Sequence, residues 1–203
     1  MSNSSATIHI VDDDVGILRA LKRLLTIAGH NVETHLCAED FLAKHDPDKP
    51  GCAIVDLGLP GLDGFGLQDS LVIDHVERPI IFLTGNGNIP ASVRAMKAGA
   101  VDFLTKPVEP NCLLSAVSQA IERDAAARQI GQERRIAEHR FATLTRRERE
   151  VFVWVVAGRL NKQIAAELGT VEKTVKVHRG RMMEKMGVRN VADLVRLGAT
   201  LHH

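Results

Sequence analysis

Acidic, hydroxyl and amino side chains follow successive strand-like runs in the first half of the chain. Asp12 and Asp13 come after the first run and Asp56 after the third, while Thr84 ends the fourth and Lys106 follows the fifth. Grouped carboxylates are costly unless a hard cation neutralises them, and Mg²⁺ prefers such oxygen ligands. With that charge screened, Asp56 can attack a phosphoryl group whose oxygens Lys106 and Thr84 contact. The pattern therefore predicts a phosphoryl-accepting site that holds Mg²⁺ or Mn²⁺.

The elements that position these side chains alternate between strands and helices. β-Branched runs predict five strands, and amphipathic runs predict the helices between them. Such alternation predicts an α/β fold with a doubly wound five-stranded parallel sheet, whose binding residues gather at the carboxyl ends of the strands. The strands are expected near Ile8–Val11, Asn31–Thr34, Cys52–Val55, Ile80–Thr84 and Val101–Leu104, and the helices near Val15–Ala28, Ala38–His45, Phe65–Asp74 and Ile89–Ala98.

Each of these polar residues also has an ordinary structural explanation. An acidic residue after a strand commonly caps the next helix, and we expect Asp14 to do so here. A lysine before a proline and a threonine at a strand end are common in any protein. The full set, in order and at the ends of the right strands, nevertheless favours the functional interpretation.

This ordered set resembles the receiver domain of two-component response regulators, which has a flavodoxin-like fold, and the resemblance covers residues 1–122. It implies that Asp56 is the phospho-acceptor. It also implies that Asp13, Asp56 and the carbonyl oxygen of Gly58 bind the metal directly, and that Asp12 binds it through water.

The same resemblance assigns the residues that respond to phosphorylation. Thr84 and Lys106 would contact the phosphoryl group, and Phe103 would be the switch aromatic that moves inward when Thr84 turns toward the phosphate. An aromatic residue on the last strand also fits a purely structural role in the core, so both interpretations of Phe103 stand. The family further implies a cis bond between Lys106 and Pro107.

The second half of the chain has the opposite charge and a helical pattern. Residues 1–120 hold 15 acidic and 9 basic residues, a balance of −6, whereas residues 121–203 hold 10 and 17, a balance of +7. Such an asymmetry indicates two domains with different partners, one of them nucleic acid. The Ala-, Arg- and Glu-rich stretch 123–140 is predicted to be a helical linker, which leaves residues 141–203 as a small all-α domain.

Four helices are expected in this second domain. Thr145 and Glu148 have the spacing of a capping box, which predicts a helix start, and Asn161 is expected to cap the second helix. The helices are expected from Thr145 to Gly158, over Lys162–Leu168, over Val171–Met186 and onward from Asn190.

Three segments of this domain resemble the LuxR-type helix-turn-helix output domain, and with the receiver ahead of them the NarL/FixJ class of regulators. They are Leu144-Thr145-Arg146-Arg147-Glu148-Arg149-Glu150-Val151, Asn161-Lys162-Gln163-Ile164-Ala165 and Thr174-Val175-Lys176-Val177-His178. Between Arg159 and Arg189 there are 8 Lys/Arg and 3 Glu residues. This positive charge supplies affinity for DNA phosphates, although a basic helical bundle that binds protein would look similar.

The resemblance also indicates which side chains would meet DNA. Lys173 lies on the outward side of the recognition helix. Base edges would be contacted by Lys176 and Val177, and phosphates by Lys162, Thr174, Arg179 and Arg181.

One departure from the family pattern concerns the start of the recognition helix. The family usually has Ile-Ser there, whereas this chain has Thr170-Val171. Either Thr170 caps the helix one residue earlier, or the entry into the helix is weaker by about 1 kcal/mol.

Together these patterns predict a transcription factor controlled by phosphorylation. A sensor histidine kinase would dock beside the first helix, around Val15–Leu18, and pass a phosphoryl group to Asp56. The protein would then dimerise through its fourth helix and fifth strand and place two recognition helices on promoter DNA, with RNA polymerase as a further partner. A constitutive DNA-binding protein with a silent receiver is the alternative.

Other classes of protein are not favoured. No apolar run approaches the roughly 20 residues that span a bilayer. The first residues lack the charge and apolar run of a signal peptide, and three widely spaced cysteines argue against a disulfide framework. These features predict a cytoplasmic protein. A phosphatase that used Asp12 and Asp14 would need a cap domain or substrate pocket that no segment remains to build, so we expect no enzyme.

Overall fold

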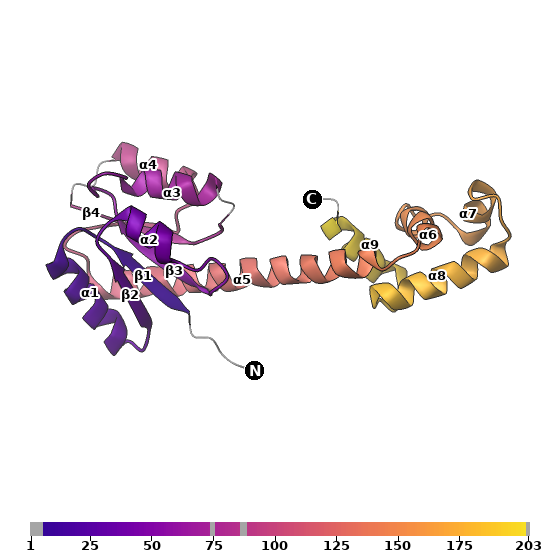
Figure 1. The fold of residues 1–203 in the computed structure, drawn as a ribbon, viewed down its shortest axis with the longest axis horizontal. Coiled ribbons are helices and arrows are strands. Elements are labelled where there is room, and N and C mark those ends of the chain that lie inside the picture. The colour runs from indigo at the N-terminus through magenta and orange to yellow at the C-terminus, as the bar shows by residue number, and fades with distance from the viewer. Residues whose placement is uncertain (1–5, 74–75, 86–88, 202–203) are drawn as a thin grey trace. The chain divides into compact units, whose positions relative to one another are not determined.

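The computed structural model describes residues 6–73, 76–85 and 89–201, which form two compact units (Figure 1). The first unit is Met1–Arg128 and the second is Gln129–His203. Within the described part of the chain, every helix is too short or too polar to cross a lipid bilayer.

The first unit is built on a five-stranded parallel sheet in the order β2–β1–β3–β4–β5. This order is that of a doubly wound fold, because the chain reverses its direction of winding between β1 and β3. The strands are β1 (Thr7–Val11), β2 (Asn31–His35), β3 (Gly51–Asp56), β4 (Ile80–Thr84) and β5 (Asp102–Thr105); the helices are α1 (Val15–Ile27), α2 (Ala38–Lys44), α3 (Gly64–Ile73), α4 (Ile89–Lys97) and the start of α5 (Pro110–Ala142).

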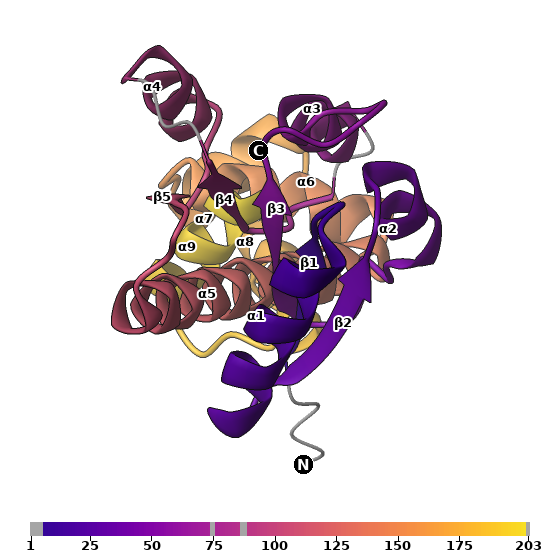
Figure 2. The same ribbon diagram turned by 90° about the vertical axis from the view of Figure 1, so that its left-hand side faces the viewer.

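Helices cover both faces of this sheet (Figure 2). Leucines of α1 and the first turns of α5 pack with Ile8, Ile54 and Ile81 on one face. On the other face, α2, α3 and α4 pack around Phe41 and Phe82. β3 is buried along its whole length, because both of its faces are covered. The predicted α/β fold is therefore confirmed.

The elements begin and end within about two residues of the predicted bounds. Asp14 caps α1 as expected, since its Oδ1 accepts hydrogen bonds from the backbone N–H groups of Gly16 and Ile17. The bond between Lys106 and Pro107 is cis, as the family resemblance implied. Asp74, the predicted end of the third helix, lies outside the described residues.

α5 is a single helix of 33 residues that contains the whole of the predicted linker, residues 123–140. Its contacts with the first unit continue past residue 122. Asp124 is buried, and its Oδ2 accepts hydrogen bonds from Gly51 N at 2.9 Å and Arg128 Nε at 2.8 Å. These are polar contacts, which the spacing of apolar residues cannot reveal.

The described residues of the second unit form four helices in addition to the end of α5: α6 (Arg146–Val156), α7 (Asn161–Glu167), α8 (Glu172–Met186) and α9 (Val191–Leu201). Their core includes Phe152, Ile164, Val175 and Met182, each of them buried. Gly187 ends α8 in the left-handed conformation, which residues with a Cβ rarely adopt.

One helix start differs from expectation, and another decides between the two alternatives that the sequence left open. Asn161 does not cap α7 but is its first residue, and the Gln163 side chain instead accepts the backbone N–H of Leu160 at 2.9 Å. The N-cap of α8 is Val171, whose side chain has no hydrogen-bonding atom. Thr170 therefore does not replace the missing serine.

Glu148 connects the start of α6 to α8. The capping box with Thr145 is present as predicted. The buried Glu148 carboxylate also accepts a hydrogen bond from Lys185 Nζ at 2.6 Å. Burial alone would raise the pKa of Glu148, but the bonds from Lys185 and Thr145 outweigh it and hold the pKa below its ordinary value of 4.5.

We expect Glu148→Gln to lower the free energy of unfolding of the second unit by about 1–3 kcal/mol, because glutamine can still cap α6 but leaves Lys185 without its charge partner. The ion pair stabilises the fold fully above the carboxyl's unfolded pKa and is lost as pH falls through the lowered folded pKa. Stability of Glu148→Gln should thus depend less on pH in the acid range. Urea unfolding followed by the fluorescence of Trp154, the single tryptophan, measures both effects.

Glu150→Gln is the control. Glu150 pairs with exposed Arg146 and Arg147 on the surface of α6, so its loss should cost within about 0.5 kcal/mol. An equal loss in the two variants would contradict the role given to Glu148.

Candidate functional site

The carboxyl ends of β1, β3 and β4 lie side by side at the point where the winding reverses. The register pairs Val11 with Val55 and Asp56 with Leu83, so Asp12, Asp56 and Thr84 follow one another along this edge. All three residues are buried, with 0%, 7% and 5% of their surfaces exposed. Two carboxylates at this depth need a cation beside them.

The ammonium group of Lys106, which follows the end of β5, is that cation. Its Nζ lies 2.6 Å from Asp12 Oδ2 and 2.6 Å from Asp56 Oδ1. Burial alone would lower the pKa of Lys106, but the hydrogen bonds to both carboxylates raise it overall. The lysine therefore remains charged at neutral pH.

The other oxygen of each carboxylate accepts a hydrogen bond from the backbone, which orients the carboxylate. Asp12 Oδ1 accepts the backbone N–H of Asp14 at 2.9 Å, and Asp56 Oδ2 accepts that of Gly58 at 2.8 Å. Asp13 is exposed beside them. The donor set consists of oxygen atoms only and is negatively charged, which suits a hard divalent cation such as Mg²⁺.

Thr84 and Phe103 lie on neighbouring strands. The register of β4 and β5 pairs Thr84 with Thr105 and Phe82 with Phe103. Thr84 is buried, and Phe103 is half-buried against the core that α2, α3 and α4 cover. The structure thus places Asp12, Asp56, Thr84 and Lys106 at one edge of the sheet, as the sequence predicted. Phe103 lies on β5, two residues before the end of that strand at Thr105.

In the second unit, the residues expected to meet DNA lie on α7 and α8. Exposed side chains are Lys162, Lys173, Lys176, Val177 and Arg181, while Thr174 and Arg179 are half-buried. The Nη1 atom of Arg179 donates to Asn161 Oδ1 at 2.8 Å. This bond orients the Arg179 guanidinium and joins the start of α7 to the middle of α8.

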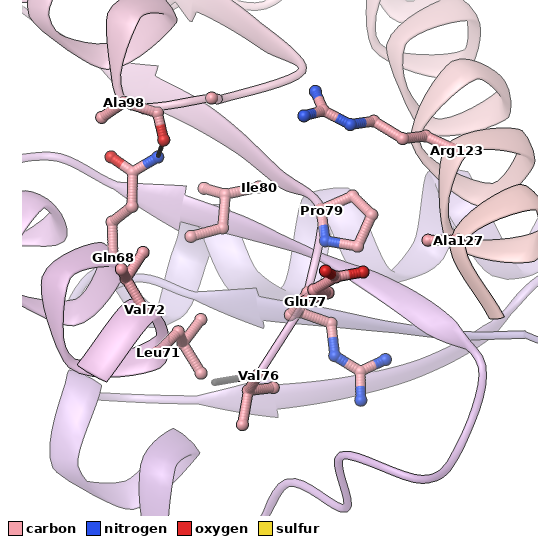
Figure 3. A pocket seen from close by; sticks show the side chains of 12 residues that line it. Gln68, Leu71, Val72, Val76, Glu77, Pro79, Ile80, Ala98, Arg123 and Ala127 are labelled. Carbon is pink, nitrogen blue, oxygen red and sulfur yellow. Dashed lines mark hydrogen bonds between the residues drawn. The ribbon is translucent and has the colours of Figure 1, made fainter. Parts of the chain in front are cut away.

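A hollow of about 470 Å³ in the first unit is separate from the acidic edge. Figure 3 shows Pro79 and Ile80 at the amino end of β4, with Gln68 of α3 and Arg123 of α5 also lining it. Thr84 is at the opposite end of the same strand. The hollow therefore does not contribute to the phosphoryl site.

A cluster of histidines was missed by the sequence reasoning. His9 on β1 and His35 on β2 are buried, at 4% and 3% exposed, and both rings contact Phe41. A histidine in the middle of an otherwise apolar strand, Thr7–Val11, is the signal that could have found them.

We expect Lys106→Met in magnesium-free buffer to lower the free energy of unfolding of the first unit by about 3 kcal/mol, because the Asp12 and Asp56 carboxylates lose their cation. Asp12→Asn in the same chain should recover part of that loss. Lys44→Met is the control, since Lys44 Nζ also lies 2.6 Å from a carboxylate, that of Asp40, but its side chain is 66% exposed. Calorimetry should show that Lys44→Met lowers the free energy of unfolding by less than about 1 kcal/mol. Equal losses for the two lysine variants would contradict the account.

Known proteins match both units in sequence. The family of the response regulator receiver domain matches residues 8–118, and the luxR family of bacterial regulatory proteins matches residues 142–197. Both families are regulatory rather than enzymatic.

Individual relatives match almost the whole chain. Nodulation protein W of Bradyrhizobium diazoefficiens is 42% identical over 200 residues, covering 98% of this chain and 88% of that protein. The transcriptional regulatory protein FixJ of Rhizobium meliloti is 39% identical over 191 residues, 94% of each chain. The solved structure of the response regulator StyR matches with a TM-score of 0.85 and 44% identity, over 96% of this chain and 98% of that one. The chain therefore belongs to the two-component response regulators of the NarL/FixJ class, which control transcription through a LuxR-type DNA-binding domain.

Proposed function

We propose that Asp56 accepts a phosphoryl group from a sensor histidine kinase, and that this modification drives the protein to dimerise and bind promoter DNA. In this proposal residues 1–122 receive the phosphoryl group, residues 123–140 connect the domains and residues 141–203 bind DNA. The observation that carries it is the position of Lys106 Nζ, 2.6 Å from both the Asp12 and the Asp56 carboxylates.

The chemistry requires a carboxylate to attack a negatively charged group. An oxygen of Asp56 forms a bond to phosphorus while the bond to the kinase histidine breaks, and the electron pair leaves with the imidazole nitrogen. Lys106 and Thr84 are placed to donate to the phosphoryl oxygens.

The metal ion would be held at the same edge. Asp13, Asp56 and the Gly58 carbonyl would bind Mg²⁺ or Mn²⁺ directly, with Asp12 bonding through water. The ion supplies positive charge that reduces repulsion between the carboxylate and the phosphoryl group.

The kinase would contact the exposed start of α1. Within the range Val15–Leu18, Val15 is 46% exposed and can contact a partner, whereas Leu18 is only 6% exposed and belongs to the core. The contact would therefore be made by the exposed start of this range.

Dimerisation would use the face of α4 and β5. Thr84 would turn toward the phosphoryl group and Phe103 would move inward, which changes the surface of β5. On α4, Ile89 is 80%, Val93 44% and Met96 48% exposed, so apolar surface is available for a partner subunit. Phosphorylation can shift the equilibrium toward the dimer only by the free energy with which it stabilises the dimerising state more than the resting one.

The dimer would place two α8 helices on DNA half-sites about one helical turn apart. Lys176 and Val177 would contact base edges, and Lys162, Thr174, Arg179 and Arg181 would contact phosphates. Lys173, on the outward side of α8, would also face the DNA. RNA polymerase is the proposed further partner at the promoter. The proposed location is the cytoplasm, which a DNA partner supports.

We expect beryllofluoride with Mg²⁺, which stands in for the phosphoryl group, to convert the protein from monomer to dimer. Light scattering measures the mass in solution. Asp56→Asn should remain monomeric, because the amide cannot bind the beryllium. Asp48→Asn, a change to an exposed carboxylate between α2 and β3, is the control and should dimerise normally.

No shift in mass, or a dimer under both conditions, would contradict the proposal and favour the alternative, a constitutive DNA-binding protein with a silent receiver. A response that persists in Asp56→Asn would also contradict it, because another residue would then be the acceptor.

We expect Lys176→Ala to weaken binding to DNA selected by the activated protein by about 1–3 kcal/mol and to relax specificity. Arg181→Ala should weaken binding to all sequences alike and reduce the slope of log affinity against log salt by about 1. Arg196→Ala, on α9 with an 80% exposed side chain, is the control and should bind as the unchanged protein does. Fluorescence anisotropy at several salt concentrations measures all three. Identical salt slopes for Arg181→Ala and the unchanged protein would contradict the assignment of Arg181.

A further inference from the structure

The buried histidines of the first unit form a cluster with a carboxylate. The register of β1 and β2 pairs His9 with Glu33 and Val11 with His35, so all of these side chains lie on the same face of the sheet. His9 Nδ1 lies 3.2 Å from His35 Nε2 and 3.7 Å from Glu33 Oε2. One ligand atom from each of His9, His35 and Glu33 lies within 4.8 Å of the others.

The proton on His35 is fixed by its other neighbour. His35 Nδ1 lies 3.0 Å from Asp40 Oδ2, and a carboxylate can only accept, so the hydrogen is on Nδ1. The lone pair of His35 Nε2 therefore points at His9 Nδ1. Metal-binding histidines typically have such a carboxylate on their second nitrogen, because it orients the ring and makes the metal-binding nitrogen more basic.

The distance between the two nitrogens fits a tetrahedral metal. Zinc–nitrogen bonds of about 2.0–2.1 Å at a tetrahedral angle separate two imidazole nitrogens by about 3.3 Å. When a metal replaces the shared hydrogen, the proton of His9 moves to Nε2, and both rings turn so that their lone pairs meet at the ion, beside the line that joins the two nitrogens. Glu33 can serve as a third ligand, and since its side chain is 58% exposed, the site is open to solvent for metal entry and for a water ligand.

The charges around the cluster partly balance. Glu33 and Asp40 are negative, while Lys44 pairs with Asp40 at 2.6 Å and Arg78 is the buried cation that acts on His9. The Arg78 guanidinium donates to the carbonyl oxygens of Lys49 and Asp46, which offset part of its charge. Two neutral imidazoles and one carboxylate are a ligand set that borderline divalent ions such as Zn²⁺ prefer, and Mg²⁺ does not.

We propose that His9, His35 and Glu33 form a second metal site, selective for Zn²⁺ or a similar transition metal, which is distinct from the acidic edge of the sheet. The ion clamps β1 to β2 on the face that α2 covers. The site shares no side chain with the acidic edge, because neither Asp12, Asp56 nor Lys106 takes part in it.

The test titrates zinc into metal-free protein with excess Mg²⁺ present, using a chromophoric chelator as competitor. His202 and His203 are replaced by alanine in every protein, because a terminal histidine pair can bind zinc by itself. We expect one zinc ion per chain at this site, with micromolar or tighter affinity. Cobalt should give the visible absorption of a tetrahedral site. Zinc should also raise the midpoint of thermal unfolding, since it binds the folded state.

His9→Gln and His35→Gln should each weaken zinc binding at least about tenfold. Glu33→Gln should weaken it as well, and because Glu33 is exposed this variant tests the proposal even where a histidine variant folds poorly. His30→Gln is the matched control and should bind zinc as the unchanged chain does, since His30 precedes β2 and is not part of the cluster. Absence of zinc binding would overturn the proposal, as would affinity that is unchanged in both His9→Gln and Glu33→Gln.

Discussion

The pairing of Lys106 with two buried carboxylates is the interaction on which the rest of the first unit depends. Asp12 and Asp56 sit at the ends of neighbouring strands with almost no exposed surface, and each contacts the same ammonium group at 2.6 Å. Without that cation, or a metal ion, two negative charges at this depth would repel each other and lose their hydration. The two carboxylates therefore favour the binding of a further cation, and of a phosphoryl group whose oxygens these cations can contact.

The fold explains why these residues can meet. A parallel sheet in the order β2–β1–β3–β4–β5 brings the carboxyl ends of β1, β3 and β4 together at the reversal of winding, although Asp12 and Lys106 are 94 residues apart in sequence. Helices on both faces bury the strands, and the polar residues that follow them form one edge. In the second unit, a small core orders α7 and α8. The basic side chains of these helices that are exposed to solvent include Lys162, Lys173, Lys176 and Arg181.

Much of this arrangement could be predicted from the sequence, because it depends on local periodicity and on the order of polar residues. The strands, the cap at Asp14 and the capping box of Thr145 and Glu148 follow from spacing alone. Residue roles at the phosphoryl site, and the boundaries at residues 122 and 140, remain predictions. The expectation that Asn161 caps α7 was wrong, because Gln163 satisfies the backbone N–H at that helix start. What the sequence did not predict are long-range contacts. Glu148 binds Lys185, Asp124 binds Gly51, and His9 meets His35 across two strands, and none of these pairs leaves a periodic pattern.

The most direct test of the central claim, that Asp56 is the group modified, is peptide mass spectrometry after incubation with acetyl phosphate and Mg²⁺. Reduction with borohydride converts the acyl phosphate to a stable alcohol, which marks its position in the chain. The account predicts a single modified residue, Asp56, and no modification when a chelator removes the metal. Modification of Asp12 or Asp13 instead, or none at all in folded protein, would contradict it.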